Sequence, residues 1–208
     1  MLNELLSRYP NLSSCKEDLK NAAEALIKCY ENGGKLMICG NGGSCADSDH
    51  IVGELMKGFL KKRPLTDEKK AEMKKNCPEI DDEILNKLQY GLPAVALTTL
   101  NAVNTAFCND VDPNLIFAQD VMALGKKGDV LISISTSGNS VNGNAAAKVA
   151  KALGITVIAL TGAKGGKLNE VADICIKVPE TETFKVQELH LPVYHYLCAA
   201  TEEHFYKA

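Results

Sequence analysis

The chain has 208 residues and a formal net charge of -3, so its charge balance gives no reason to expect a nucleic acid or an anionic membrane as a partner. Aromatic residues make up 5% and Trp is absent, which argues against a base-stacking surface. No apolar run approaches the ~20 residues of a membrane span, and the first residues lack the layout of a signal peptide. We therefore expect a cytoplasmic chain whose length suits one α/β domain.

Eight cysteines lie mostly within apolar runs, and none forms a CxxC pair. In a chain without a secretion signal, this pattern predicts reduced, buried thiols that pack as small hydrophobic side chains. Cys39 and Cys45 flank a glycine loop, but nothing marks either of them as a nucleophile.

Predicted strands and helices alternate along the chain. A helical pattern extends to about Asn32 and is ended by Gly33 and Gly34. Short apolar runs predict five strands, at residues 35–39, 94–98, 130–134, 155–160 and 173–178. Further helices are expected at residues 44–59, 102–107, 114–124, 142–153 and 183–206. Ser44 is the predicted cap of the first of these helices, and Pro192 is predicted to kink the last. Strands that alternate with helices indicate a parallel sheet covered on both faces, a three-layer αβα sandwich.

Residues 61–90 differ in composition from the rest. They are rich in Lys, Glu and Asp, contain few large apolar residues and are punctuated by Pro64 and Pro78. We interpret them as a charged helical hairpin or lid, an insert within a single domain of residues 1–208. A basic cluster at its start is interpreted as a solvated surface rather than a device that steers an anionic substrate; it comprises Lys57, Lys61, Lys62 and Arg63.

A run of hydroxyl residues follows the strand at 130–134 and precedes an Ala-rich helix. A buried strand that leads into a helix presents backbone N–H groups and the positive end of the helix dipole to an anion. Hydroxyl donors add to these at Ser135, Thr136, Ser137 and Ser140. The sequence therefore predicts a site for a phosphorylated small molecule.

Glycine-rich loops occur at two other places. Residues 40–44 read Gly-Asn-Gly-Gly-Ser, which is not the dinucleotide fingerprint because the third glycine is misplaced and no acidic residue follows at the right distance. The case for ligand binding by this loop is strengthened because the carboxyl ends of parallel strands bring it to the same crevice as the hydroxyl run. Residues 162–167 are one residue short of a Walker A loop, and Leu168 stands where that loop has its hydroxyl. They predict a surface turn.

His50 and Glu54 are four residues apart and share one face of a helix. This arrangement suits a metal site or a base held by an imidazole, but it also occurs as an ordinary surface pair. His195 stands among apolar residues, where a buried structural histidine is the commoner finding.

The order of these motifs resembles the phosphoheptose (sedoheptulose-7-phosphate) isomerases of the SIS (sugar isomerase) superfamily. The residues that carry the resemblance are the glycine loop at 40–44, His50-x-x-x-Glu54, the hydroxyl run at 135–140, and Gln187 with His195. The match covers nearly the whole chain outside residues 61–90. It implies a five-stranded parallel sheet in a flavodoxin-like arrangement, with additional N- and C-terminal helices.

The resemblance also implies roles for particular residues. The sugar phosphate would be bound by Asn41, Gly42, Gly43, Ser44, Ser135, Thr136, Ser137, Ser140 and Gln187. Glu54 would be the base and His195 the acid of an aldose–ketose interconversion through an enediol(ate). A zinc ion would be held by His50, Glu54, Gln187 and His195. The family further implies a homotetramer with active sites at subunit interfaces.

The sequence departs from the family pattern at three places. The family often has an acidic residue near Thr98 and Thr99, whereas this chain continues with Leu100 and Asn101. Gly58 stands near a position that is often arginine, and residues 61–90 are longer than the usual connection. Gln187 and His195 are also eight residues apart, or about 12 Å along a straight helix. A shared metal site would need an unwound helix, a bend at Pro192 or a ligand from another subunit.

A second hypothesis is a non-catalytic sugar-phosphate-binding regulator or interaction protein of the same superfamily. The presence of both Glu54 and His195 favours the enzyme, because binding alone does not require an acid–base pair.

Overall fold

Five parallel strands form the centre of the molecule, and the structure, a computed structural model, describes residues 1–206. The strands are β1 (Leu36–Gly40), β2 (Ala94–Ala96), β3 (Val130–Ser135), β4 (Thr156–Thr161) and β5 (Ile174–Lys177). Their order in the sheet is β2-β1-β3-β4-β5, which is the flavodoxin-like order. The order reverses between β1 and β3, so the loops that follow these two strands flank the switch point at which such sheets bind ligands.

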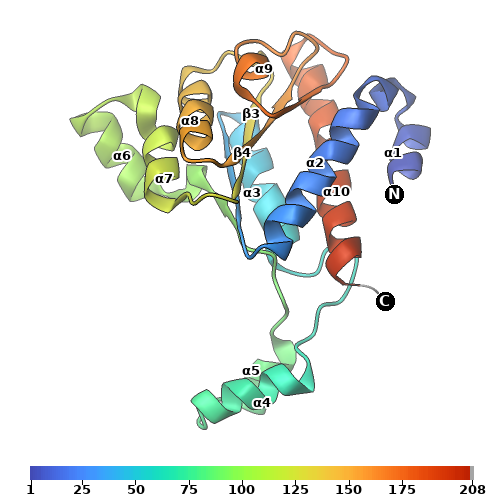
Figure 1. Ribbon diagram of the computed structural model, residues 1–208, viewed down its shortest axis with the longest axis vertical. Helices are drawn as coiled ribbons and strands as arrows, with labels where there is room; N and C mark the ends of the chain where they lie inside the picture. Colours follow the sequence, from blue (N-terminus) through green and yellow to red (C-terminus); the bar gives the residue numbers. More distant parts are fainter. Residues whose placement is uncertain (207–208) are drawn as a thin grey trace.

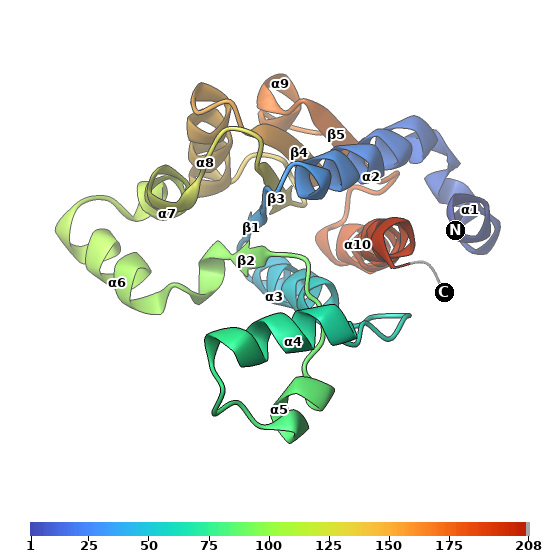
Figure 2. The same cartoon turned by 60° about the horizontal axis from the view of Figure 1, so that its bottom comes forward.

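Helices cover both faces of the sheet (Figures 1 and 2). On one face lie α2 (Lys16–Glu31), α3 (Gly43–Met56) and α10 (Thr183–Phe205), with α1 (Leu2–Arg8) beside α2 and α10. On the other lie α7 (Ile116–Leu124), α8 (Val141–Ala152) and the short α9 (Leu168–Val171), and α6 (Asn101–Asp110) packs outside α7.

Alternate residues of each strand feed the two cores. In β1, Leu36 and Ile38 belong to the core under α2, α3 and α10, whereas Met37 and Cys39 belong to the core under α7 and α8. All four side chains are fully buried. This two-sided burial explains the continuous apolar runs and confirms the predicted αβα sandwich.

Several helix boundaries differ from the prediction. The N-terminal pattern is divided by a 3-10 helix (Pro10–Cys15) that begins at a proline, which has no N–H to continue the preceding helix. Helix α3 has Gly42 rather than Ser44 as its N-cap, because the chain enters the helix with a φ of 58° that glycine adopts without strain. Helix α10 continues through Pro192 without interruption, and this proline is buried.

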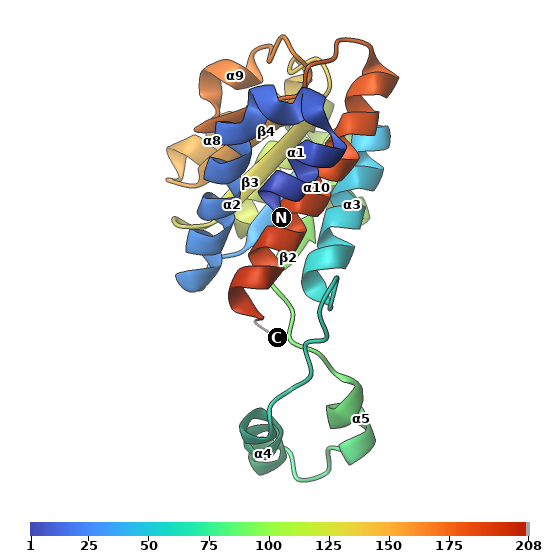
Figure 3. The ribbon, with the colours of Figure 1, turned by 90° about the vertical axis from the view of Figure 1, so that its right-hand side faces the viewer.

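The charged residues 61–90 contain α4 (Asp67–Asn76) and α5 (Asp82–Lys87) and project from the body of the molecule (Figures 1 and 3). The two connecting segments pair through an antiparallel bridge between Pro64 and Gln89. No residue of α4 is buried, so the projecting arm contributes little to the core.

All eight cysteines are free thiols, and four of them are buried. Cys77 and Cys108 are exposed, contrary to the prediction of mostly buried thiols, because Cys77 follows α4 and Cys108 lies on α6, and neither helix has a buried residue. In residues 1–206 no helix combines the length and the apolar character that crossing a membrane requires.

Arg63 corrects the interpretation of the basic cluster as solvated, because its side chain is fully buried against Glu202. Arg63 donates from Nε and Nη2 to Glu202 Oε1 at 2.9 and 2.8 Å, and from Nη1 to the carbonyl of Leu55 at 2.6 Å. Glu202 also accepts the backbone N–H groups of residues 59–61, at 2.7 to 3.2 Å. The pair thus provides hydrogen-bond partners for the backbone N–H and carbonyl groups that have no partner within the helix where α3 ends.

Replacement of Arg63 by Met should lower the free energy of unfolding by about 3–5 kcal/mol, because it leaves the Glu202 carboxylate buried without its partner. Urea denaturation followed by circular dichroism measures this loss. The matched control is Lys61→Met, which breaks a contact with the exposed Glu203 and should cost under about 1 kcal/mol.

The loss of unfolding free energy in Arg63→Met should become smaller at acid pH. Burial alone would raise the pKa of Glu202, but the N–H groups of Phe59 and Leu60 and the Arg63 guanidinium outweigh it and lower that pKa. The stabilisation is therefore complete above the unfolded carboxyl pKa of about 4.3 and disappears as the pH falls through the lower native pKa. A gap between wild type and Arg63→Met that stayed constant down to acid pH would contradict this account.

Candidate active site

The two predicted ligand loops lie side by side at the carboxyl ends of β1 and β3. The glycine loop joins β1 to α3, and the hydroxyl turn (residues 135–140) joins β3 to α8. Asn41 and Asn142 exchange two amide hydrogen bonds of 2.9 Å each, which connect the glycine loop to the first turn of α8. The sequence-predicted convergence of the two loops is therefore present.

A close backbone approach fixes the shape of the hydroxyl turn. Gly138 has a φ of 68°, and a Cβ there would stand 1.9 Å from the carbonyl oxygen of Gly165. No other residue fits this position. The N–H of Asn139 donates to Ser137 Oγ at 3.2 Å, so this turn is also held by its own side chains.

Ser140 is the N-cap of α8, and its buried Oγ has no hydrogen-bond partner within the described residues. The hydroxyl stands at the end of a 12-residue helix where free N–H groups and the positive dipole attract an anion. Ser135, at the end of β3, is 7% exposed, whereas Ser137 lies on the surface. The turn thus offers hydroxyl and amide donors that suit a phosphoryl group.

A second group of side chains lies farther along α3 and α10 and is here called the imidazole–carboxylate cluster: His50, Glu54 and His195. His50 Nε2 is 3.2 Å from Glu54 Oε1 and 3.5 Å from His195 Nε2. The rings of the two histidines meet edge to face, with centroids 5.0 Å apart. The structure therefore brings together three of the four residues predicted for the acid–base and metal roles.

The environment of the cluster lowers the pKa of His195. Burial lowers the pKa of His195, and the neighbouring His50 lowers it further, while Glu54 acts in the opposite direction. Glu54 is 15% exposed and also lies 3.6 Å from Lys57 Nζ. A carboxylate that is shielded from water yet contacts an imidazole is a suitable proton acceptor.

Gln187, the fourth predicted metal ligand, lies elsewhere on α10. A Cβ added to Gly43 would stand 2.5 Å from Gln187 Nε2, so the amide packs directly against the start of α3. Within the described residues it makes no hydrogen bond to the cluster, because α10 remains helical between Gln187 and His195. Gln187 therefore belongs to the glycine-loop end of the site.

The donor chemistry of the cluster suits zinc only in part. The 3.2 and 3.5 Å separations resemble the ligand–ligand distance of about 3.4 Å around a tetrahedral zinc. In residues 1–206, however, no group of three or more His, Cys, Asp or Glu side chains is arranged to hold a metal ion. The single chain thus presents pairs of donors at suitable spacing and not a complete coordination shell.

Asp49 supplies a carboxylate at one of the positions where the sequence departs from the family pattern. Thr98, after β2, donates from Oγ1 to Asp49 Oδ1 at 3.0 Å. The acidic group beside Thr98 is therefore Asp49 of α3, and not a residue that follows β2.

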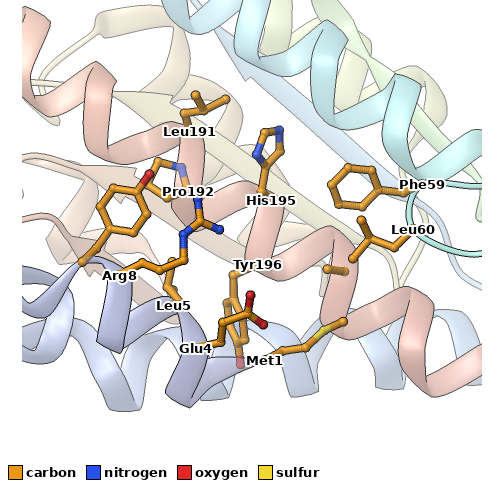
Figure 4. A pocket seen from close by; sticks show the side chains of 12 residues that line it. Met1, Glu4, Leu5, Arg8, Phe59, Leu60, Leu191, Pro192, His195 and Tyr196 are labelled. Atoms are coloured by element: carbon orange, nitrogen blue, oxygen red, sulfur yellow. The ribbon is translucent and has the colours of Figure 1, made fainter.

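A cavity of about 450 Å³ lies beside His195, and Figure 4 shows the side chains that line it. Arg8 of α1 stands on one side of His195, and Phe59 and Leu60 stand on the other. His195 is the one predicted site residue that lines this cavity. The cavity therefore adjoins the imidazole–carboxylate cluster and not the hydroxyl turn.

The sequence analysis did not identify Tyr194 or the hydrogen-bonding role of Asp47. Tyr194 donates to Asp47 Oδ1 at 3.2 Å and contacts His50 Nδ1 at 3.1 Å. Asp47 stands three residues before His50 and so shares its helix face, which is a weak signal. Nothing in the sequence indicates that Tyr194, 144 residues after His50, reaches that ring.

Comparison with known proteins places these features in a class. Residues 3–89 and 84–162 match the model of the SIS domain. A phosphoheptose isomerase of Rhodospirillum rubrum is 40% identical over 94% of this chain and 90% of its own length. Phosphoheptose isomerase 2 of Campylobacter jejuni is 41% identical over 90% of this chain and 81% of its own.

Solved structures agree with these relatives. A phosphoheptose isomerase from Francisella tularensis superimposes with a TM-score of 0.74 at 32% identity, covering 97% of this chain and 98% of that one. The enzyme from Neisseria gonorrhoeae gives a TM-score of 0.72 at the same identity and coverage. The chain belongs to the phosphoheptose isomerase family of SIS domain proteins.

Ser140→Ala should separate anion binding from stability. The hydroxyl makes no hydrogen bond in the protein, so its removal should leave the melting temperature unchanged or slightly higher. Affinity for inorganic phosphate, measured by isothermal titration calorimetry, should fall about tenfold to a hundredfold, the effect of one hydrogen bond to a charged group.

Ser48→Ala is the matched control with the opposite signature. Ser48 Oγ donates to the carbonyl of Ser44 at 2.8 Å in a fully buried position, so this variant should lose stability and keep its phosphate affinity. Unchanged phosphate affinity in Ser140→Ala would remove Ser140 from the binding site.

Proposed function

We propose that this chain is an aldose–ketose isomerase that converts sedoheptulose 7-phosphate to D-glycero-D-manno-heptose 7-phosphate. The observation that carries the proposal is the contact of the shielded Glu54 carboxylate with His50, beside His195, in a chain that also has the hydroxyl turn. Relatives about 40% identical over most of their length are phosphoheptose isomerases. A binding protein would not need the acid–base pair.

The residues divide the reaction between them. The hydroxyl turn holds the phosphate, and the glycine loop with Gln187 contacts the sugar. Glu54 takes the proton from C1 of the ketose while His195 gives a proton to the C2 oxygen, which produces an enediol. Glu54 then returns its proton to C2 as the C1 hydroxyl proton leaves to regenerate His195. The carbonyl has moved from C2 to C1, and no proton is gained or lost overall.

The site is proposed to be completed in a homotetramer, with active sites at subunit interfaces. His50 lies seven residues after Gly43, so within one chain the cluster is about 10 Å along α3 from the glycine loop. Apolar side chains remain exposed near the cluster, including Met56 at 54%, Leu60 at 61% and Leu191 at 41%. Such a surface suits contact with another copy of the chain. A cytoplasmic location is part of the proposal and is supported by the eight free thiols.

Zinc is part of the proposal as well. His50, Glu54 and His195 would hold it, with Gln187 contributed by a neighbouring subunit. When bound, zinc would polarise the substrate carbonyl as a Lewis acid.

Replacement of Glu54 by Gln should abolish proton transfer and preserve binding. The wild-type protein should exchange the C1 proton of sedoheptulose 7-phosphate with deuterated water, measured by NMR. The variant should exchange about 10²–10⁴-fold more slowly, which is the range for removal of a general base.

Lys57→Gln is the control, because it removes an exposed charge beside Glu54 and should keep most of the exchange. Tight binding without exchange, across a panel of five- to seven-carbon ketose phosphates, would instead support the non-catalytic sugar-phosphate-binding regulator.

Native mass spectrometry tests assembly and metal together. We expect four copies of the chain with one zinc per copy, and loss of the zinc but not of the fold in His50→Gln. A monomer would contradict the interface site, and a metal-free tetramer with full isomerase activity would contradict the zinc.

A further inference from the structure

A row of three hydrogen-bonded groups lies behind the imidazole–carboxylate cluster. Tyr194 donates from its hydroxyl to Asp47 Oδ1 at 3.2 Å, and the hydroxyl oxygen of Tyr194 also lies 3.1 Å from His50 Nδ1. The Tyr194 side chain is 2% exposed and its ring meets the His50 ring edge to face, with centroids 5.4 Å apart. Nδ1 of His50 thus contacts Tyr194 of α10, while Nε2 faces Glu54.

The directions of these bonds are fixed by the number of protons. A hydroxyl has one proton to donate, and a carboxylate has none, so the proton of Tyr194 is directed to Asp47. Toward His50 the Tyr194 oxygen can then act only as an acceptor. The contact at 3.1 Å is therefore a hydrogen bond only if His50 Nδ1 carries the proton. A neutral His50 therefore keeps its free lone pair on Nε2. Burial raises the pKa of Tyr194, and Asp47 raises it further, which keeps its hydroxyl protonated.

We propose that Tyr194, oriented by Asp47, is a positioning residue that fixes His50 in the tautomer protonated on Nδ1 and directs its Nε2 lone pair toward Glu54. The role of this tautomer in the reaction rests on the proposed isomerase function, whereas the tautomer itself does not.

In the proposed tautomer the contact between His50 and Glu54 is unfavourable while Glu54 is ionised, and it becomes a hydrogen bond once Glu54 is protonated. His50 Nε2 and Glu54 Oε1 stand 3.2 Å apart, and in the proposed tautomer both are acceptors. When Glu54 has taken the substrate proton, its O–H has an acceptor ready at this distance. His50 thereby stabilises the protonated base in the enediol intermediate, and the same lone pair is the one that a metal ion would require.

The test reads the tautomer directly. The chain has four histidines, so ¹⁵N-labelled histidine gives few signals, and His50→Gln assigns those of His50. Long-range ¹H–¹⁵N spectra of the wild-type protein should show a protonated Nδ1 and a bare Nε2 for His50. In Tyr194→Phe, which keeps the ring and removes the hydroxyl, we expect this pattern to be lost or reversed.

Asp47→Leu provides a second variant in which Tyr194 remains. With its carboxylate acceptor gone, the Tyr194 hydroxyl is free to donate to His50 Nδ1, so the proton should move to Nε2. Tyr30→Phe is the matched control: it also deletes a buried hydroxyl, but that hydroxyl has no partner within the described residues, so the His50 signals should not change.

Kinetics supply the second readout. If the chain is an isomerase, Tyr194→Phe should lower kcat about tenfold to a hundredfold, the range for loss of a group that orients a functional histidine, and should leave KM unchanged. An absence of isomerase activity in the wild type would refute the proposed function and leave the NMR result interpretable. His50 doubly protonated in the wild type, or His50 signals unchanged in Tyr194→Phe, would overturn the inference.

Discussion

The buried ion pair between Arg63 and Glu202 is the constraint on which the geometry of the site depends. Arg63 holds the last carbonyl groups of α3, and Glu202, near the end of α10, holds the N–H groups that follow α3. The two helices that carry the imidazole–carboxylate cluster are therefore joined at one end by a single charged contact. Because loss of either partner would leave an uncompensated buried charge, this contact helps to hold the ends of α3 and α10 together.

The other end of the same two helices carries the ligand loops. Gln187 packs against Gly43 where α3 begins, and Tyr194 contacts Asp47 and His50 midway. The helices thus touch at three levels, and each level has different groups in contact: an amide against a glycine, a hydrogen-bonded tyrosine, and a buried ion pair. A displacement at the Arg63 level would change the spacing between His50 and His195.

Much of the fold follows from local patterns in the sequence. The five strands are short apolar runs, of which β1, β3 and β4 are buried on both faces. The glycine and hydroxyl loops could be assigned because parallel strands place them at one edge. Arg63 was misjudged because a run of basic residues does not show which member points inward. Tyr194 could not be found because its contact with His50 depends on how two distant helices pack. Gln187 resembles a ligand in the sequence, but a continuous helix places it two turns away from His195.

The projecting arm has an evolutionary consequence. Its α4 buries nothing, and the arm joins the body through two adjacent segments closed by the Pro64–Gln89 bridge. Residues beyond that bridge, apart from the buried Leu65 and Leu85, can accordingly be exchanged among descendants of this gene under little selection from the catalytic body. Sequence changes in the arm can therefore accumulate in a lineage without changes to the residues of the enzyme body.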